Sequence, residues 1–222
     1  GIPTAAETAA VGSCLALIEQ TGVRVHFCRL STQRAMQMLD RAKFDGAPIS
    51  ADISAHHLFL SDMDITDFDG NYHMLPPLRS RTDVAGLRHK LNSEIIVSLC
   101  SDHQPHERDA KLAPFASTEP GISTLETLLP LALQLVKDKV AELTDIISLL
   151  TYKPAHLINI KAGNLSPGRP ADLCICDPTI EWQLTAETMH SRGKNTPFLN
   201  KTLKGKVTHT FVNGKLVYEI KS

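Results

Sequence analysis

Short apolar runs alternate with stretches of helical periodicity along most of the chain. The apolar runs are rich in β-branched residues and predict buried strands at 23–28, 48–54 and 94–99. The stretches between them repeat apolar residues at helical spacing and predict helices at 4–18, 31–42, near 61, at 82–91 and from 123 onward. Alternation of strands and helices is typical of parallel βαβ units, so the sequence predicts the α/β class.

Side chains at the ends of these segments predict where two of the helices begin. Thr4 and Glu7 have the spacing of a capping box, and Ser31 precedes the second helical stretch. Continuous apolar strands covered by helices are typical of a parallel sheet. Three such units are too few to close an eight-stranded barrel, which takes about 250 residues. We therefore expect half of a (β/α)8 barrel or a small open sheet.

The pattern changes at Gly163, after which helical periodicity disappears. Gly163-Asn164 and Pro167-Gly168 indicate turns. Strands are predicted at 171–176, 208–212 and 215–220. Asn213-Gly214 joins the last two, and this dipeptide is a strong hairpin signal. The sequence thus predicts a barrel-like region at 1–163 and a β-rich region at 164–222.

Composition narrows the class of protein. The 222 residues are 42% hydrophobic and 21% charged, with a net charge of -1. A charge balance this close to neutral does not indicate binding to nucleic acid. No apolar run reaches the roughly 20 residues that span a bilayer. The 5 cysteines are scattered, which favours reduced thiols and a cytoplasmic protein. The start at Gly1 resembles neither a signal peptide nor a complete N-terminus, so we expect the chain to begin inside a longer gene product.

Polar clusters follow each of the predicted parallel strands. They are His26 with Arg29, His56 with His57, and the Asp102 to His106 segment. In barrels and open α/β sheets, functional sites form at the carboxyl ends of strands. Histidine and aspartate there could hold zinc and activate water, although each histidine alone is more simply a hydrogen-bonded one.

At these residues the chain resembles the C-terminal half of a dihydroorotase, a member of the amidohydrolase superfamily. The resemblance extends in order along the whole sequence and includes more than one motif. The motifs are Ala55-His56-His57-Leu58-Phe59-Leu60, Leu75-Pro76-Pro77-Leu78-Arg79, Ser101-Asp102-His103-Gln104-Pro105-His106, Ala113-Pro114-Phe115, the 121–127 segment, Pro154-Ala155, Gly168-Arg169-Pro170-Ala171-Asp172-Leu173, Asn195-Thr196-Pro197-Phe198 and Val212-Asn213-Gly214-Lys215.

The resemblance implies a fold, a cofactor and residue roles. Dihydroorotases are (β/α)8 barrels with a small β-sandwich, and they use zinc to interconvert dihydroorotate and carbamoyl aspartate in pyrimidine synthesis. His56 matches a metal ligand on the sixth barrel strand. Asp102 matches the strand-eight aspartate, which binds metal and acts as general base. His106 matches a histidine that contacts the substrate carboxylate.

Two departures from the family pattern weaken the expectation of zinc chemistry. The family's His-Val-Ser-Thr run is Arg29-Leu30-Ser31-Thr32 here, and arginine only donates hydrogen bonds and cannot coordinate a cation. The substrate-binding asparagine of the Asn-Pro-Pro-Leu-Arg loop is Leu75. The family's His-x-His pair and bridging Lys or Asp have no counterpart in this sequence. Two candidate ligands, His56 and Asp102, are fewer than a zinc site needs, so we expect no zinc in this chain alone.

Three functions remain open at this stage. The first is a non-catalytic dihydroorotase homologue that acts as a scaffold for aspartate transcarbamoylase, as other inactive homologues in the family do. The second is a working zinc-dependent dihydroorotase of which this chain is the C-terminal portion, completed by self-association or by a separate N-terminal half. The third is a related cyclic amidase such as a hydantoinase or allantoinase, against which the Pro76-Pro77-Leu78-Arg79 run and the 195–198 run argue.

Other polar and aromatic residues have simpler interpretations. We expect His26 and His57 to be packed or hydrogen-bonded, and His103 to hold its loop. Arg79 is expected to form a local cap or ion pair. Trp182 and Phe198 are expected in the core of the β-rich region.

Overall fold

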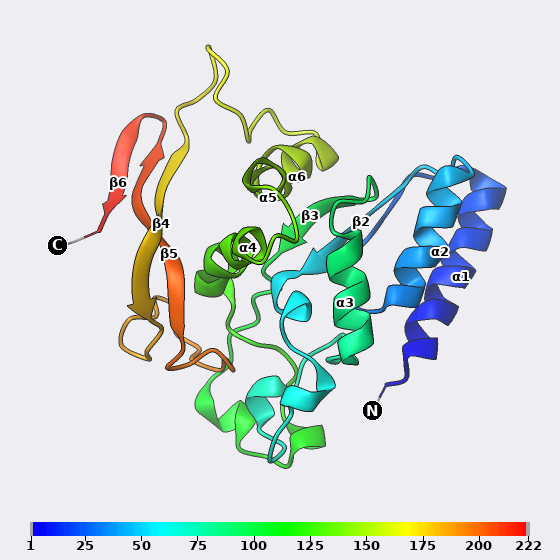
Figure 1. Cartoon of the computed structure of the whole chain (residues 1–222), viewed down its shortest axis with the longest axis horizontal. Helices are drawn as coiled ribbons and strands as arrows, with labels where there is room; N and C mark the ends of the chain where they lie inside the picture. The colour runs from blue at the N-terminus through cyan, green and yellow to red at the C-terminus, as the bar shows by residue number, and fades with distance from the viewer. Residues whose placement is uncertain (1, 221–222) are drawn as a thin grey trace.

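Two three-stranded sheets organise the computed structural model, which describes residues 2–220 (Figure 1). The first sheet is parallel, in the order β1-β2-β3, as the sequence predicts. The second is antiparallel, in the order β4-β5-β6. The strands are β1 (Val25–Phe27), β2 (Ile49–Ser54), β3 (Ile96–Cys100), β4 (Leu173–Gln183), β5 (Thr202–Val212) and β6 (Lys215–Glu219).

Within residues 2–220, six α-helices and several short 3-10 helices connect and cover the strands. The α-helices are α1 (Thr4–Thr21), α2 (Gln33–Phe44), α3 (Arg81–Lys90), α4 (Leu128–Lys137), α5 (Leu143–Leu150) and α6 (Tyr152–Leu157). The 3-10 helices are η1 (Ala55–Leu58), η2 (Asp62–Asp64), η3 (Gly70–Tyr72), η4 (Arg108–Lys111), η5 (Phe115–Ser117) and η6 (Leu125–Thr127). Helices α5 and α6 were not predicted. The helix expected from Ser123 begins only at Leu128, because the residues before it form the tighter turn η6.

The two faces of the parallel sheet differ in polarity, which corrects the prediction of strands apolar on both sides. In β2, Ile49, Ala51 and Ile53 belong to the hydrophobic core. Ser50, Asp52 and Ser54 alternate with them and therefore point to the opposite face. Strand β1 was expected to be buried, yet it is only partly covered because it lies at an edge of the sheet. The polar face can therefore carry chemistry.

Both predicted helix starts differ in detail. Helix α1 begins at Thr4 behind Pro3, with no side-chain cap, because Glu7 is engaged elsewhere. Helix α2 is capped by Thr32, whose hydroxyl accepts the Ala35 N–H at 3.2 Å. Ser31, the expected cap, bonds to Glu7 instead.

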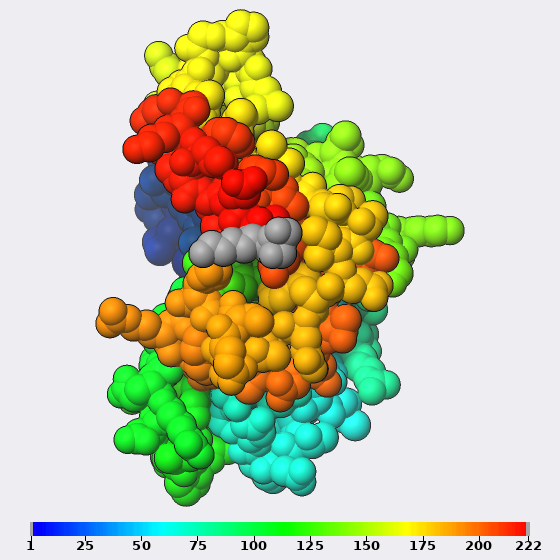
Figure 2. Space-filling view, turned by 90° about the vertical axis from the view of Figure 1, so that its left-hand side faces the viewer, coloured from blue at the N-terminus to red at the C-terminus, as the bar shows by residue number. Residues whose placement is uncertain are grey.

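The β-rich region forms as the hairpin signal predicts. Asn213 and Gly214 take φ angles of 50° and 76°, and Val212 pairs with Lys215 across the turn. A turn with both central residues in the left-handed region matches the twist of the strands. When the molecule is viewed from the left-hand side of Figure 1, the residues of the β-rich region form most of the visible surface (Figure 2).

One hydrophobic core connects the two sheets. Helix α4 lies between them, in contact with both β5 and η1 (Figure 1). Leu184, Phe198 and Leu203 belong to the same buried cluster as the residues of the parallel sheet, while Trp182 packs against that cluster. Phe198 and Trp182 thus take the packing roles expected of them, and the division at residue 163 stays a prediction. No helix within residues 2–220 is long and apolar enough to cross a membrane.

Candidate functional site

An ion pair joins the carboxyl ends of the two edge strands of the parallel sheet. Arg29 follows β1 and Asp102 follows β3, and Arg29 Nη1 lies 3.2 Å from Asp102 Oδ1. The same nitrogen donates to the carbonyl of Leu75 at 3.3 Å. The side chain of Gln104 donates to Asp102 Oδ1 at 2.8 Å. The carboxylate is therefore already neutralised by a cation of the chain itself.

The backbone at both members of this pair is left-handed. Arg29 has φ 58° and Asp102 has φ 48°, a conformation that non-glycine residues seldom adopt. At Arg29 the turn is supported by its own N–H, which donates to Asp52 Oδ1 at 2.6 Å. The chain therefore bends sharply at the end of each strand and directs these side chains towards each other.

Two histidines are buried side by side just after β2. His56 is 1% exposed and His57 is 2% exposed, with ring centroids 4.6 Å apart. His57 Nε2 lies 3.1 Å from the carbonyl of Pro76, as expected of a hydrogen-bonded residue. Both ring nitrogens of His56 lack a hydrogen-bond partner within the described structure. Burial, and next the neighbouring His57, holds the pKa of His56 well below its ordinary value of 6.5.

The loop after β3 is fixed by a residue from the β-rich region. Asn195 accepts the His106 N–H at 2.8 Å and donates to the carbonyls of Gln104 and Gly121 at 3.1 and 3.0 Å. The His106 ring lies 3.1 Å from the carbonyl of Pro120. His103 Nδ1 accepts the N–H groups of Thr124 and Leu125, so it holds its loop as predicted.

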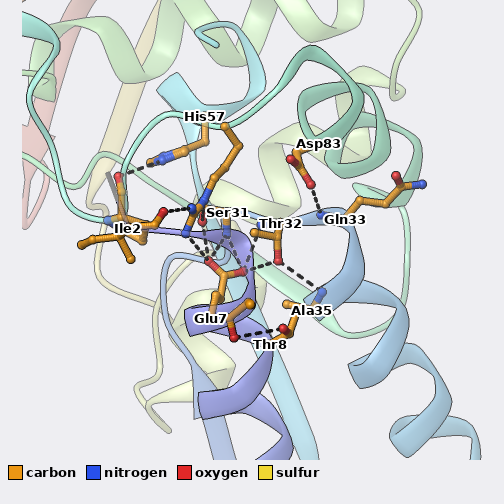
Figure 3. Close-up of polar contacts among 12 residues, drawn as sticks. Ile2, Glu7, Thr8, Ser31, Thr32, Gln33, Ala35, His57 and Asp83 are labelled. Atoms are coloured by element: carbon orange, nitrogen blue, oxygen red, sulfur yellow. Dashed lines mark hydrogen bonds and ion pairs between the residues drawn. The ribbon is translucent and has the colours of Figure 1, made fainter. Parts of the chain in front are cut away.

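Glu7 of α1 bonds to Ser31 and Thr32 (Figure 3), and its carboxylate lies 3.9 Å from Arg79 Nη2. Its carboxylate accepts the Ser31 N–H at 3.1 Å, the Thr32 N–H at 2.9 Å and the Thr32 hydroxyl at 2.8 Å. It also accepts the Ser31 hydroxyl. Arg79 donates to Ser31 Oγ at 3.0 Å and to the carbonyl of Ile2 at 2.7 Å. Arg79 therefore makes long-range contacts with the N-terminal segment and the Ser31 loop, and not the local cap or ion pair expected of it.

The two departures from the dihydroorotase pattern border the same space. Arg29 and Leu75 line a hollow of about 310 Å³ together with Glu7, Arg79, Ile2 and the two prolines after Leu75. Leu75 presents an apolar side chain that is 41% exposed. A polar ligand in this hollow would meet a guanidinium and a hydrocarbon surface in place of an imidazole and an amide.

Comparison with known proteins decides the family. The model of the amidohydrolase family matches residues 6–217. The chain belongs to the amidohydrolase family. A dihydroorotase-like protein of Pseudomonas aeruginosa is 42% identical over 99% of this amidohydrolase chain, and one from Pseudomonas putida is 43% identical over 98%. A dihydroorotase of Syntrophus aciditrophicus is 38% identical over 99% of the chain. The resemblance to dihydroorotases is thus confirmed.

The match covers only part of these relatives. The chain spans about half the length of the curated relatives, 51 to 52% in these three. Among solved structures, an L-hydantoinase from Arthrobacter aurescens has a TM-score of 0.91 at 26% identity, with 98% of this chain and 49% of that chain covered. A D-hydantoinase has a TM-score of 0.90 at 23% identity, which shows a common fold.

Members of the amidohydrolase family depend on metals in general, so the fit of zinc to His56 and Asp102 can be tested on this geometry. The partnerless nitrogens of His56 suit a ligand. Asp102, however, is paired with Arg29. Neither residue belongs to a group of three possible ligands anywhere in residues 2–220. The residues at this position therefore do not fit a zinc ion, and the roles that the resemblance implies for Asp102, His56 and His106 stay predictions.

One group of three possible metal ligands does occur within the described residues, on the polar face of the sheet. Ligand atoms of His26, Cys28 and Asp52 all lie within 4.8 Å of one another. His26 is hydrogen-bonded, as expected, to Ser50 Oγ at 2.9 Å and Asp52 Oδ2 at 3.0 Å. Burial alone would raise the pKa of Asp52, but hydrogen bonds from His26 and the Arg29 backbone lower it overall.

Sequence reasoning missed Glu7, Asp52 and Asn195. Asp52 lies inside a predicted strand, where a carboxylate among apolar residues is itself unusual and could have marked a site. Asn195 falls within a dihydroorotase motif, but nothing in the spacing shows that it reaches back 89 residues to His106. Glu7 was interpreted as part of a capping box, and because that role explained the residue, its bonds to Ser31 and Thr32 were not predicted.

Proposed function

We propose that this chain is the C-terminal portion of a dihydroorotase-like protein that holds no catalytic zinc at Asp102 and acts in pyrimidine synthesis through association with other chains. The observation that carries the proposal is the Arg29–Asp102 ion pair. It places a permanent cation against the carboxylate that would otherwise bind metal and act as general base.

Simple electrostatics supports this proposal. Two unit charges about 4 Å apart near a protein surface interact by about 4 kcal/mol, and a divalent ion doubles that value. Zinc beside Asp102 would have to displace Arg29 or bear this repulsion. Because Arg29 also donates to the carbonyl of Leu75, its displacement would break two contacts. The names of the relatives with 42 and 43% identity, both dihydroorotase-like, are consistent with this function.

The fold supports a place within a larger barrel. The parallel sheet has open edges at β1 and β3, and an open edge invites pairing with further strands. The TM-score of 0.91 to half of a hydantoinase supports the same view. We infer that β1, β2 and β3 form part of a (β/α)8 barrel, and that β4, β5 and β6 form part of its small β-sandwich.

Aspartate transcarbamoylase is the partner that we propose from the dihydroorotase resemblance. The support from the structure is general: large apolar side chains such as Leu17, Val23 and Leu165 are 60, 52 and 82% exposed. Apolar surface of this kind often marks contacts with other chains. Sedimentation of the purified full-length protein, mixed with aspartate transcarbamoylase from the same source, is expected to give a complex larger than either component. Separate sedimentation at micromolar concentration would exclude this partner.

A working zinc-dependent dihydroorotase is the second candidate. The partnerless ring of His56 favours it, since a buried imidazole without hydrogen bonds is suited to a metal. In this alternative the missing ligands come from outside this chain, and Arg29 moves away from Asp102 when zinc binds.

Zinc content and dihydroorotate turnover of the full-length protein separate the two candidates. The proposal predicts no turnover above background with saturating zinc. It also predicts that Arg29→His raises zinc uptake, because the imidazole joins His56 and Asp102 to reach the minimum of three ligands. Turnover that requires zinc and disappears in Asp102→Asn would overturn the proposal and establish the enzyme.

A further inference from the structure

We propose that His26, Cys28 and Asp52 form a binding site for a single zinc ion on the polar face of the parallel sheet, separate from the Asp102 position. The site does not rest on the proposed function. It uses a different carboxylate and a thiolate, and it is defined by the geometry of β1 and β2.

The strand register brings the three ligands to one face. His26 pairs with Ser50 across β1 and β2, and residues two apart in a strand share a face. Cys28 therefore follows His26, and Asp52 follows Ser50, on the same side of the sheet. Three different donor types, imidazole, thiolate and carboxylate, then lie within 4.8 Å of one another. This donor combination is one that zinc accepts.

The distance between two of the ligands requires little rearrangement. His26 Nε2 and Asp52 Oδ2 are 3.0 Å apart. Two such ligands on a tetrahedral zinc, each at about 2.0 to 2.1 Å, lie roughly 3.3 Å from each other. The two ligand atoms need to move apart by only a few tenths of an ångström for the ion to replace the proton between them.

The surrounding residues already hold two ligands in binding orientation. His26 Nδ1 lies 2.9 Å from Ser50 Oγ, so a proton on Nδ1 can be donated there and leave the Nε2 lone pair for the metal. Asp52 Oδ1 accepts the Arg29 N–H at 2.6 Å and the Cys100 thiol at 3.4 Å, which turns Oδ2 towards His26. Such second contacts are typical of metal-binding histidines and carboxylates.

Charge and access also suit a zinc ion. A neutral His26, a Cys28 thiol and an ionised Asp52 carry a charge of about −1; zinc binding releases the thiol proton to water and brings the total to about zero. Asp52 is 7% exposed, but Cys28 is exposed, so the site has a buried base and an open entrance. A fourth position is left for water. Magnesium and calcium prefer oxygen ligands and would not use Cys28.

Arg29 does not compete for this site. Its guanidinium is directed to Asp102 and the carbonyl of Leu75, while only its backbone N–H contacts Asp52. The same residue that excludes zinc from Asp102 thus helps to orient Asp52.

Cobalt titration of the full 222-residue chain tests the proposal, because a Co²⁺–thiolate bond gives a charge-transfer band in the near ultraviolet. We expect one equivalent of Co²⁺ to produce the band and one equivalent of Zn²⁺ to abolish it. Cys28→Ser should lose the band and at least tenfold in zinc affinity. Cys14→Ser and Cys174→Ser, which alter other exposed cysteines, should retain both.

Two further variants complete the test. His26→Gln should weaken zinc binding in parallel with Cys28→Ser, and circular dichroism should confirm that both variants are folded. Asp102→Asn should leave the band unchanged, which separates this site from the dihydroorotase position. Absence of a band in the native chain, or a band that survives in Cys28→Ser, would overturn the proposal. Zinc that is lost in Asp102→Asn but kept in Cys28→Ser would overturn both this proposal and the proposed function.

Discussion

Single neighbouring residues determine whether a carboxylate of this protein pairs with a cationic side chain or is left with an oxygen that could bind a metal. Asp102 is neutralised by Arg29, whereas Asp52 is surrounded by donors that leave one oxygen facing His26. The replacement of an imidazole by a guanidinium at residue 29 was visible in the sequence. Its contact with Asp102, 73 residues away, required the structure. The separate contacts of Asp52 were not foreseen, because no local pattern signals them.

The buried pair His56 and His57 should make stability depend on pH. Burial lowers the pKa of both residues below 6.5, although the backbone carbonyls of Pro77 and Pro76 oppose this at His57. Below pH 6.5 the unfolded chain binds protons that the folded chain does not. The stabilisation is thus complete above 6.5 and is lost as the pH falls towards the folded pKa values. Each histidine should contribute a slope of at most about 1.4 kcal/mol per pH unit in that window, and His56, with the larger shift, should contribute more than His57.

Urea unfolding between pH 7 and pH 5 measures this slope. His56→Leu should reduce it by one histidine's share. At pH 7 the same variant should be neutral or more stable by about 1 to 2 kcal/mol, because it removes a buried polar ring without partners. His89→Gln, at an exposed position, is the control. Equal changes of slope in both variants would contradict the assignment to His56.

At the scale of secondary-structure elements, β4 and β5 extend well beyond the strands predicted at 171–176 and 208–212. All three parallel strands, the antiparallel hairpin at Asn213-Gly214 and helices α1 to α3 appear where the pattern placed them. Helix α6 was missed because it is only 6 residues long and contains Pro154, whereas the apolar residues of α5 do repeat at helical spacing and could have predicted it. Helix α2 begins at Gln33 and is capped by Thr32 in place of Ser31, and Glu7 of α1 bonds both of these residues.

Glu7 should be a major support of the junction between α1 and α2. Glu7→Gln replaces one acceptor oxygen by an NH₂ group that faces the N–H groups of Ser31 and Thr32. Hydrogen bonds to charged groups contribute about 1.5 to 3 kcal/mol each, so a loss of about 2 to 4 kcal/mol is expected in urea unfolding. Glu19→Gln, on the exposed face of the same helix, should change stability by less than about 0.5 kcal/mol. Similar losses in both variants would refute the anchoring role.

Gly163 should be required by the turn between α6 and β4. It has φ 77°, and an added Cβ would lie 2.5 Å from the carbonyl oxygen of Thr151. Gly168 has φ 83° but nothing within 4 Å of such a Cβ. Gly168→Ala should therefore cost only backbone strain, about 1 to 2 kcal/mol. Gly163→Ala should cost about 1 to 3 kcal/mol more, because backbone atoms must move. Equal thermal stabilities of the two variants would contradict this interpretation.

At the scale of the whole molecule, α1 stands out as a helix whose apolar residues are not confined to its buried side. It lies at the outer edge of the molecule and contacts α2 (Figure 1). Only Val11 and Ile18 are buried along it, while its many alanines and Leu17 face outward. Exposed apolar residues that cluster on a surface often mark contacts with other chains. Together with the open edge at β1, this surface favours contact with another chain or with a further segment.

Leu17→Lys should therefore reduce association. The native chain is expected to sediment with a concentration-dependent mass above that of a monomer, and Leu17→Lys should shift it towards the monomer by at least twofold in dissociation constant. Leu112→Lys changes a leucine that is 67% exposed on the loop after β3 and serves as the control. A monomer at all concentrations, or equal effects of both variants, would exclude α1 as a contact surface.

The left-handed turns at Arg29 and Asp102 also bear on how the family diverges. Each of these positions demands a backbone shape that asparagine, aspartate, glycine and, less readily, histidine or arginine can take, whereas valine, isoleucine and threonine cannot do so without strain. A saturation library selected only for folded protein should therefore be depleted of β-branched residues at 29 and 102 even where no metal or substrate is present. A narrow choice of residues at these two positions among homologues would then reflect the backbone conformation. It would not by itself indicate a catalytic role.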